Sequence, residues 1–180
     1  MHKLRSALFV VVMSFLSIAS LSARTSPHET VSAPIDGCRV TIVYGRPYSK
    51  DPKTGEIRKI WGKLVPYGAP WRTGSDEATL LITQKDIALG GVTIPAGAYT
   101  LYTQPEENGT AKLIVNKQIG QWGTVYDSKQ DFARVDLKAE PLDPQIDEFT
   151  IAVEKNPAGG GLIKLMWEKT QFSVPFTVAK

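Results

Sequence analysis

The sequence predicts an all-β protein: a single-domain antiparallel β-sandwich or jelly-roll-like fold of about eight to nine short strands, with one long aromatic-rich loop. Three observations lead to this prediction. Apolar and polar residues alternate along much of the chain, as is typical of half-buried strands. Turn-forming Gly, Asn and Pro residues separate the alternating segments. Helical periodicity never extends beyond a turn or two, and the clearest instance lies near 128–132.

The expected strands follow one another at short intervals. In the first, Val40, Ile42 and Tyr44 share one face. Later strands are expected at 77–83, 87–89, 92–94, 98–103, 112–116 and 133–139. The dipeptides Gly90-Gly91 and Asn108-Gly109 are typical of tight turns between such strands.

The last part of the chain predicts a β-meander. Apolar residues alternate at 149–153, at 163–167 and at 172–178, while 156–161 and 169–170 are expected to form turns. Because Pro175 has no backbone N–H donor, the last strand is expected at a sheet edge or at a bulge.

Residues 1–23 are expected to form a secretory signal peptide, and residues 24–180 to form the β-sandwich domain. Lys3 and Arg5 precede an apolar run at 7–18, and the small residues at 20–23 suit a signal peptidase. The run is too short to span a bilayer. We therefore expect an exported protein, periplasmic or secreted. Cys38, the single cysteine, lies too far downstream to carry a lipid anchor and has no partner for an intramolecular disulfide.

Charge and hydropathy bear on the expected partners. The chain holds 21 basic and 18 acidic residues, and removal of Lys3 and Arg5 leaves a net charge of +1. It has no basic block, so nucleic acid is not an expected partner. No second apolar stretch is long enough to cross a membrane, so no stable membrane insertion is expected after the signal peptide is removed.

The segment 45–76 has no clear strand pattern and is long for a connection, which favours a functional loop. It combines aromatic rings with guanidinium groups, which suit saccharides and carboxylate or phosphate groups. A second polar and aromatic cluster occupies 116–126. The expected ligand-binding residues of the two clusters are Tyr44, Arg46, Trp61, Tyr67, Trp71, Arg72, Asn116, Lys117 and Trp122. The alternative is that Arg72 pairs with Asp76 or Glu77 while the tryptophans cover the open end of the sandwich.

Several segments together resemble the exported bacterial family called domain of unknown function (DUF) 2911. These are SPH at 26–28, YGRP at 44–47, IWG at 60–62, LVPYGAPWRTG at 64–74, IPAGAY at 94–99, IVNK at 114–117, QWG at 121–123 and VPF at 174–176. The resemblance covers almost all of the mature chain. It implies a β-rich envelope or secreted protein and implies no mechanism.

No catalytic residue is identified, and neither a metal nor a cofactor is expected. With His2 in the signal peptide, His28 is the only histidine of the mature chain, too few for a histidine-based metal site. Asp76 and Glu77 are adjacent, so on a strand their carboxylates point to opposite faces and cannot form a glycosidase pair with each other.

Three functions remain open. The leading hypothesis is a non-enzymatic ligand-binding module of the cell envelope, whose ligand is a saccharide or a small anionic compound. The second is a hydrolase of envelope material that uses His28, Asp76 or Glu77 as acid or base. The third is a structural or assembly partner of another envelope protein.

Overall fold

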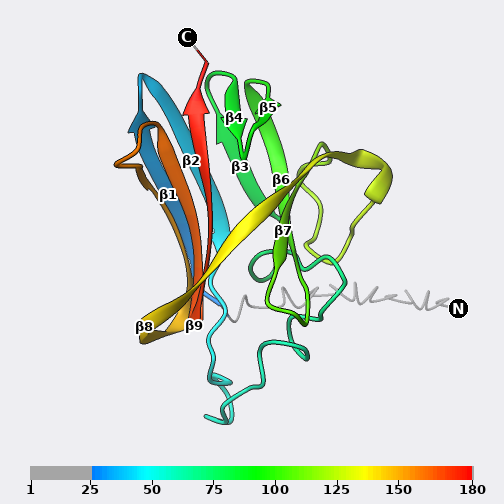
Figure 1. The fold of residues 1–180 in the computed structure, drawn as a ribbon. Helices are drawn as coiled ribbons and strands as arrows, with labels where there is room; N and C mark the ends of the chain where they lie inside the picture. Colours follow the sequence, from blue (N-terminus) through cyan, green and yellow to red (C-terminus); the bar gives the residue numbers. More distant parts are fainter. Residues whose placement is uncertain (1–25, 180) are drawn as a thin grey trace, which may run out of the picture.

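A computed structural model describes residues 26–179, and the predicted signal peptide, 1–23, lies outside the described residues. The predicted all-β class is confirmed, with nine strands in one antiparallel sheet that does not close (Figure 1). The strand order is β1-β2-β3-β6-β7-β8-β9-β4-β5. The elements are β1 (His28–Ile35), β2 (Cys38–Gly45), β3 (Thr79–Thr83), β4 (Ile87–Leu89), β5 (Val92–Ile94), β6 (Gly97–Pro105), β7 (Ala111–Asn116), η1 (Ser128–Gln130), β8 (Asp131–Lys155) and β9 (Gly161–Val178).

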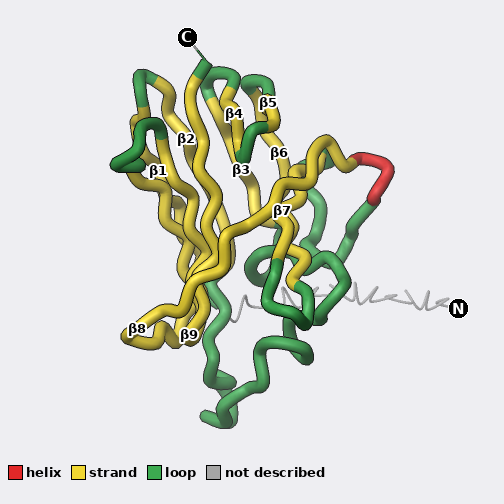
Figure 2. The backbone as a smooth tube through the Cα atoms, in the orientation of Figure 1, coloured by secondary structure: helices red, strands yellow, loops and turns green. Residues whose placement is uncertain are grey.

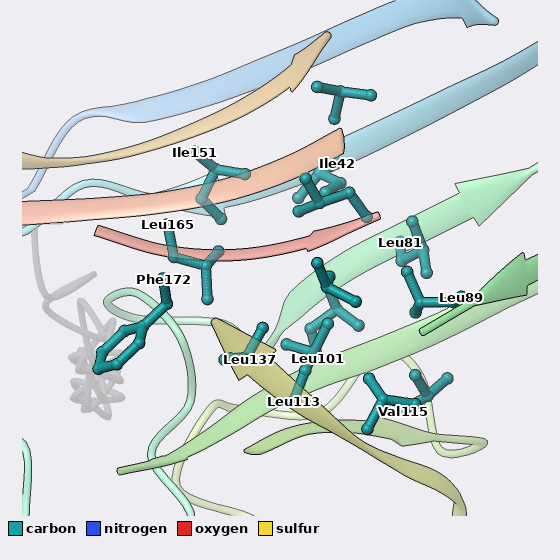
Figure 3. Packing of buried hydrophobic residues seen from close by; sticks show 14 of the residues in the cluster. Ile42, Leu81, Leu89, Leu101, Leu113, Val115, Leu137, Ile151, Leu165 and Phe172 are labelled. Atoms are coloured by element: carbon teal, nitrogen blue, oxygen red, sulfur yellow. The ribbon is translucent and has the colours of Figure 1, made fainter. Parts of the chain in front are cut away.

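The sheet folds over one hydrophobic core because β8 crosses from one part of the sheet to the other. Its first residues pair with β7, and the rest pair with β9, with register shifts between Pro141 and Thr150. Alternate residues of the strands on both sides of this crossing meet in a single core cluster. Figure 3 shows ten of them labelled: Ile42, Leu81, Leu89, Leu101, Leu113, Val115, Leu137, Ile151, Leu165 and Phe172.

The C-terminal strands differ from the predicted meander. The segments 163–167 and 172–178 belong to one continuous strand, β9, and the expected turn at 169–170 is absent. The chain accommodates a local irregularity instead, because Glu168 has a left-handed φ of 52°. Beyond Ser173, β9 leaves β8 and pairs with β4. Pro175 lies at this change of partner, where its carbonyl accepts a hydrogen bond from Gly90 at 2.9 Å.

The long loop 45–76 lies at one end of the sandwich, below the strands in Figures 1 and 2. It contains only isolated bridges, among them Trp71 with Thr103 in β6. Trp71 stacks on Trp167 at 5.8 Å and meets Phe149 edge-on at 5.1 Å. The loop therefore covers the end of the core with aromatic rings, as the alternative interpretation of its tryptophans expected.

Within residues 26–179, no helix has the length and apolar character needed to cross a membrane.

Candidate functional site

A cleft of about 400 Å³ lies beside this aromatic cover. One wall comes from the long loop, and the other comes from β6 and the segment 123–126. The polar side chains that line it are Ser26, Arg58, Arg72, Ser75, Asp76, Tyr102, Thr124 and Tyr126. We call this site the arginine cleft.

Backbone pairing joins the two walls. Gly123 donates its N–H to the carbonyl of Asp76 at 2.9 Å, and Ala78 donates to Gln121 at 3.2 Å. These bonds bring the two polar and aromatic clusters of the sequence, 45–76 and 116–126, into one site. The sequence suggested each cluster separately but did not indicate the register between them.

Gly123 leaves the space that the Arg72 side chain occupies. A Cβ atom at position 123 would overlap the Arg72 Cδ and would lie 2.9 Å from the Arg72 Cβ and 2.8 Å from the Asp76 carbonyl oxygen. All three separations are shorter than normal van der Waals contacts. Any side chain at 123 would therefore displace Arg72 or separate the two walls.

The wall that carries Arg72 and Asp76 has an unusual backbone. Thr73 and Asp76 both have left-handed φ values, 54° and 63°, which are rare for a β-branched residue such as Thr73. Buried hydrogen bonds hold this conformation: the Thr73 hydroxyl pairs with that of Thr103 at 2.8 Å, and Thr79 donates to the Thr73 carbonyl at 2.7 Å. Strained residues fixed by their surroundings are a common feature of binding sites.

The two arginines of the cleft have no carboxylate partner. Among residues 26–179, neither Arg58 nor Arg72 forms an ion pair within 4.0 Å. Arg72 donates its Nε–H to the Gly74 carbonyl at 3.3 Å, and Arg58 donates to the Tyr48 carbonyl while its own buried Nε has no partner. The alternative pairing of Arg72 with Asp76 or Glu77 is thus not observed.

Two acceptors in the same cleft are also unsatisfied. The Ser75 Oγ and the Asp76 Oδ2 are buried and have no hydrogen-bond partner in the described part of the chain. Buried polar atoms normally have a partner, and three of the unmatched ones, the Arg58 Nε, the Ser75 Oγ and the Asp76 Oδ2, belong to residues that line this cleft.

Tyr102 and Tyr126 form the opposite wall, with ring centroids 4.7 Å apart. The Tyr126 hydroxyl donates to Asp131 at 2.7 Å and accepts from Arg134 at 2.7 Å. Burial and the nearby Asp131 carboxylate raise the pKa of Tyr126 to about 12, so its phenol is neutral at ordinary pH. This wall therefore adds no negative charge to the cleft.

Comparison of the chain with known protein families gives one match. The family model described as "Protein of unknown function (DUF2911)" matches residues 26–176, which include both walls of the cleft and all strands except the last two residues of β9. The chain belongs to the DUF2911 family. No curated protein and no solved structure matches it.

In this DUF2911 chain, Trp71 and Arg72 are the two expected ligand residues that line the arginine cleft. Trp71 is only 8% exposed, because its ring is part of the aromatic cover. Trp61 packs edge-on against Trp167 and Phe172 in the same cover, away from the cleft lining.

Two other expected ligand residues hold the sheet together. The Tyr44 hydroxyl accepts a hydrogen bond from the Ile151 N–H at 2.8 Å and donates to Glu29 at 3.1 Å. Arg46 forms ion pairs with Glu29 at 2.9 Å and with Glu148 at 3.2 Å. Both residues therefore connect β1 and β2 with β8.

The remaining four expected residues lie outside the cleft lining, Asn116 at the end of β7 and the other three on loops. Asn116 is buried and donates from Nδ2 to the Asp127 carbonyl and to the Asp131 carboxylate, both at 2.9 Å. Lys117 lies 5.3 Å from the centroid of the Phe132 ring. Tyr67 is exposed beside Gly62, and Trp122 is 49% exposed.

The sequence did not single out Arg58, Ser75, Tyr102 or Tyr126 as ligand residues. Tyr126 belongs to the polar and aromatic cluster, so composition gave a partial indication. Tyr102 lies in a regular strand, and Arg58 lies in a stretch of the loop without aromatic neighbours in sequence. Only the three-dimensional arrangement brings them to the cleft.

The geometry at Asp76 and Glu77 corrects the expectation that these carboxylates point apart. Both approach one nitrogen, the His28 Nε2, which lies 3.0 Å from the Glu77 Oε2 and 3.8 Å from the Asp76 Oδ2. Strand alternation does not apply here, because β3 begins only at Thr79 and Asp76 has a left-handed φ. A second cavity, of about 310 Å³, lies on the side of His28, Glu77 and Tyr44.

Proposed function

We propose that this chain is an exported, non-enzymatic binding module that holds a small anionic ligand in the arginine cleft. The observation that carries the proposal is that Arg58 and Arg72 line one cleft without any ion-pair partner among the described residues. A guanidinium group offers a planar set of donors that matches carboxylate and phosphate oxygens, and it remains charged at every relevant pH. A volume of about 400 Å³ lies within the usual range of small-molecule sites.

The cost of burying charge supports a ligand over a purely structural role. A partly buried guanidinium without an ion-pair partner loses hydration, and for Arg58 and Arg72 one hydrogen bond each to a backbone carbonyl offsets only part of this cost. Arg46 and Arg134 of the same chain have carboxylate partners, as structural arginines commonly do. Arg58 and Arg72 would gain such a partner when an anion binds.

The aromatic cover supports the anionic class over a neutral saccharide. A sugar that stacks on tryptophan needs a free ring face, and the Trp71 ring is stacked on Trp167 and 8% exposed. Trp71 therefore shapes the floor of the cleft, while the polar side chains recognise the ligand.

Export forms part of the proposal and is supported by the sequence of residues 1–23. Its basic start, apolar run and small residues are typical of a signal peptide. Fractionation of cells that express the full chain tests this part: the protein should appear in the periplasm or the medium, and a cytoplasmic full-length product would contradict export.

Calorimetric titration of the purified protein tests the binding site. We expect saturable binding of small carboxylates or inorganic phosphate and none of neutral glucose. Arg72→Gln and Arg58→Gln should each weaken binding by about tenfold or more, because each removes a charge-assisted contact. Arg39→Gln, the same change at an exposed position on β2, is the matched control. Equal affinity in wild type and in the three variants would rule out the arginine cleft as the site.

One observation favours a second candidate, a hydrolase. Asp76 lines the cleft and lies 3.8 Å from His28, which also contacts Glu77, so an acid and a base stand at the edge of a cavity. Turnover of ester, glycoside or peptide substrates that disappears in a folded His28→Ala variant would support this function. Absence of turnover across those panels would exclude it for these substrate classes.

A further inference from the structure

Asp76 places a carboxylate in a cleft that we propose for anions. A ligand that carries only negative charge would gain from Arg58 and Arg72 but would be repelled by Asp76. The proposed function alone does not explain why an acid lines the site. If the proposed function holds, the Asp76 carboxylate indicates which chemical class of ligand the cleft binds.

The Asp76 carboxylate lacks a hydrogen-bond donor in the described chain. Its side chain is 16% exposed, and its buried Oδ2 has no hydrogen-bond partner. The nearest cationic group is the His28 imidazole at 3.8 Å, whose Nε2 lies closer to Glu77, at 3.0 Å. A carboxylate without a donor is costly, and a ligand N–H group would donate to the part of the Asp76 side chain that is exposed.

Arg72 and Asp76 line one cleft, yet they do not pair with each other. Their backbone contacts hold them apart: the Arg72 Nε–H is bound to the Gly74 carbonyl, and the Asp76 carbonyl is bound to the Gly123 N–H. The left-handed φ of Asp76 further fixes the direction of its side chain. Two opposite charges that line one cleft without pairing match a ligand that carries the opposite pattern.

Ser75 adds a further acceptor beside Asp76. Ser75 is 6% exposed, lines the cleft, and its Oγ has no partner among the described residues. Within the described lining residues the charged groups are therefore Arg58 and Arg72, which are cationic, and Asp76, which is anionic. Asp51 lies outside the lining: the backbone N–H groups of Lys53 and Thr54, and less strongly Arg58, lower its pKa.

We infer that the ligand is a small zwitterion with two carboxylates and one ammonium group, the pattern of a dicarboxylic α-amino acid. The carboxylates contact Arg58 and Arg72, and the ammonium group donates to Asp76. Each charge in the cleft then has a partner of opposite sign.

The test compares L-glutamate with two analogues that lack the ammonium group, glutarate and N-acetyl-L-glutamate, by calorimetric titration of the purified protein. Wild type should bind L-glutamate about tenfold or more tightly than either analogue, since the analogues lose a charge-assisted contact. In Asp76→Asn this preference should disappear. Asn accommodates the left-handed φ at this position, so the fold should be kept.

Asp136→Asn, the same change on an exposed carboxylate of β8, is the control and should keep the preference. If the analogues bind wild type as tightly as L-glutamate while Arg72→Gln weakens all three, the anion site stands and the zwitterion inference is wrong. If none of the three compounds binds wild type, the inference is also wrong. If the preference survives in Asp76→Asn, the ammonium group does not contact Asp76.

Discussion

Replacing Gly123 by Ala should damage ligand binding more than it damages the fold. The new Cβ would lie 2.9 Å from the Arg72 Cβ and 2.8 Å from the Asp76 carbonyl oxygen, and it would also overlap the Arg72 Cδ. Since normal separations between carbon atoms are about 3.5–4.0 Å, Arg72 must move by roughly 1 Å. Overpacking of this kind costs about 1–3 kcal/mol of stability. A displacement of about 1 Å at a recognition group can lower affinity by about tenfold or more.

Chemical denaturation and calorimetric titration of Gly123→Ala measure the two effects separately. The matched control is Gly109→Ala, in a turn where an added Cβ would meet no heavy atom within 4 Å but φ is 86°. This control should lose about 1–2 kcal/mol through backbone strain and retain full affinity. If Gly123→Ala binds as tightly as wild type, Gly123 does not position Arg72 for the ligand.

Three further predictions concern stability. Trp71→Ala should lower the free energy of unfolding by about 3–5 kcal/mol, measured by denaturant titration, because its ring packs on Phe149 and Trp167; a loss below about 1 kcal/mol would contradict a core role. Asn116→Ala should cost about 1–3 kcal/mol in the same assay, since it removes three partly buried side-chain hydrogen bonds, and an unchanged midpoint would show that they contribute little. Tyr126 has a raised pKa of about 12 in the fold against about 10 unfolded, so its stabilising effect is complete below pH 10 and is lost as the pH rises towards 12. The unfolding midpoint of wild type should therefore fall more steeply than that of Tyr126→Phe in this range, and parallel curves would refute the assignment.

Much of the fold could be predicted from the sequence because alternation directly reports which face of a strand is buried. Val40, Ile42 and Tyr44 are all buried in β2, as their spacing predicted. The continuity of β9 could not be predicted in this way. A polar stretch at 169–170 is typical of a turn, but pairing with two successive partners, β8 and β4, keeps the chain extended there.

The site was less accessible to sequence reasoning. Two of the ligand residues expected from composition, Trp71 and Arg72, line the cleft, but the contribution of β6 to its wall was not expected. Composition could not identify Asp76 as a cleft residue, because the expected strand alternation depends on a regular backbone and Asp76 has a φ of 63°. It also could not separate Arg46 from Arg72, since whether an arginine has a carboxylate partner depends on contacts with residues as distant in sequence as Glu148.

Binding of carboxylates in the arginine cleft can be followed directly through the arginine side-chain Nε–H signals in nuclear magnetic resonance spectra while L-glutamate or glutarate is added. We expect the signals of Arg58 and Arg72 to shift and saturate together, while those of Arg39 and the ion-paired Arg46 remain in place. Signals of Arg58 and Arg72 that stay unchanged with both compounds would contradict the proposal that this cleft binds carboxylates.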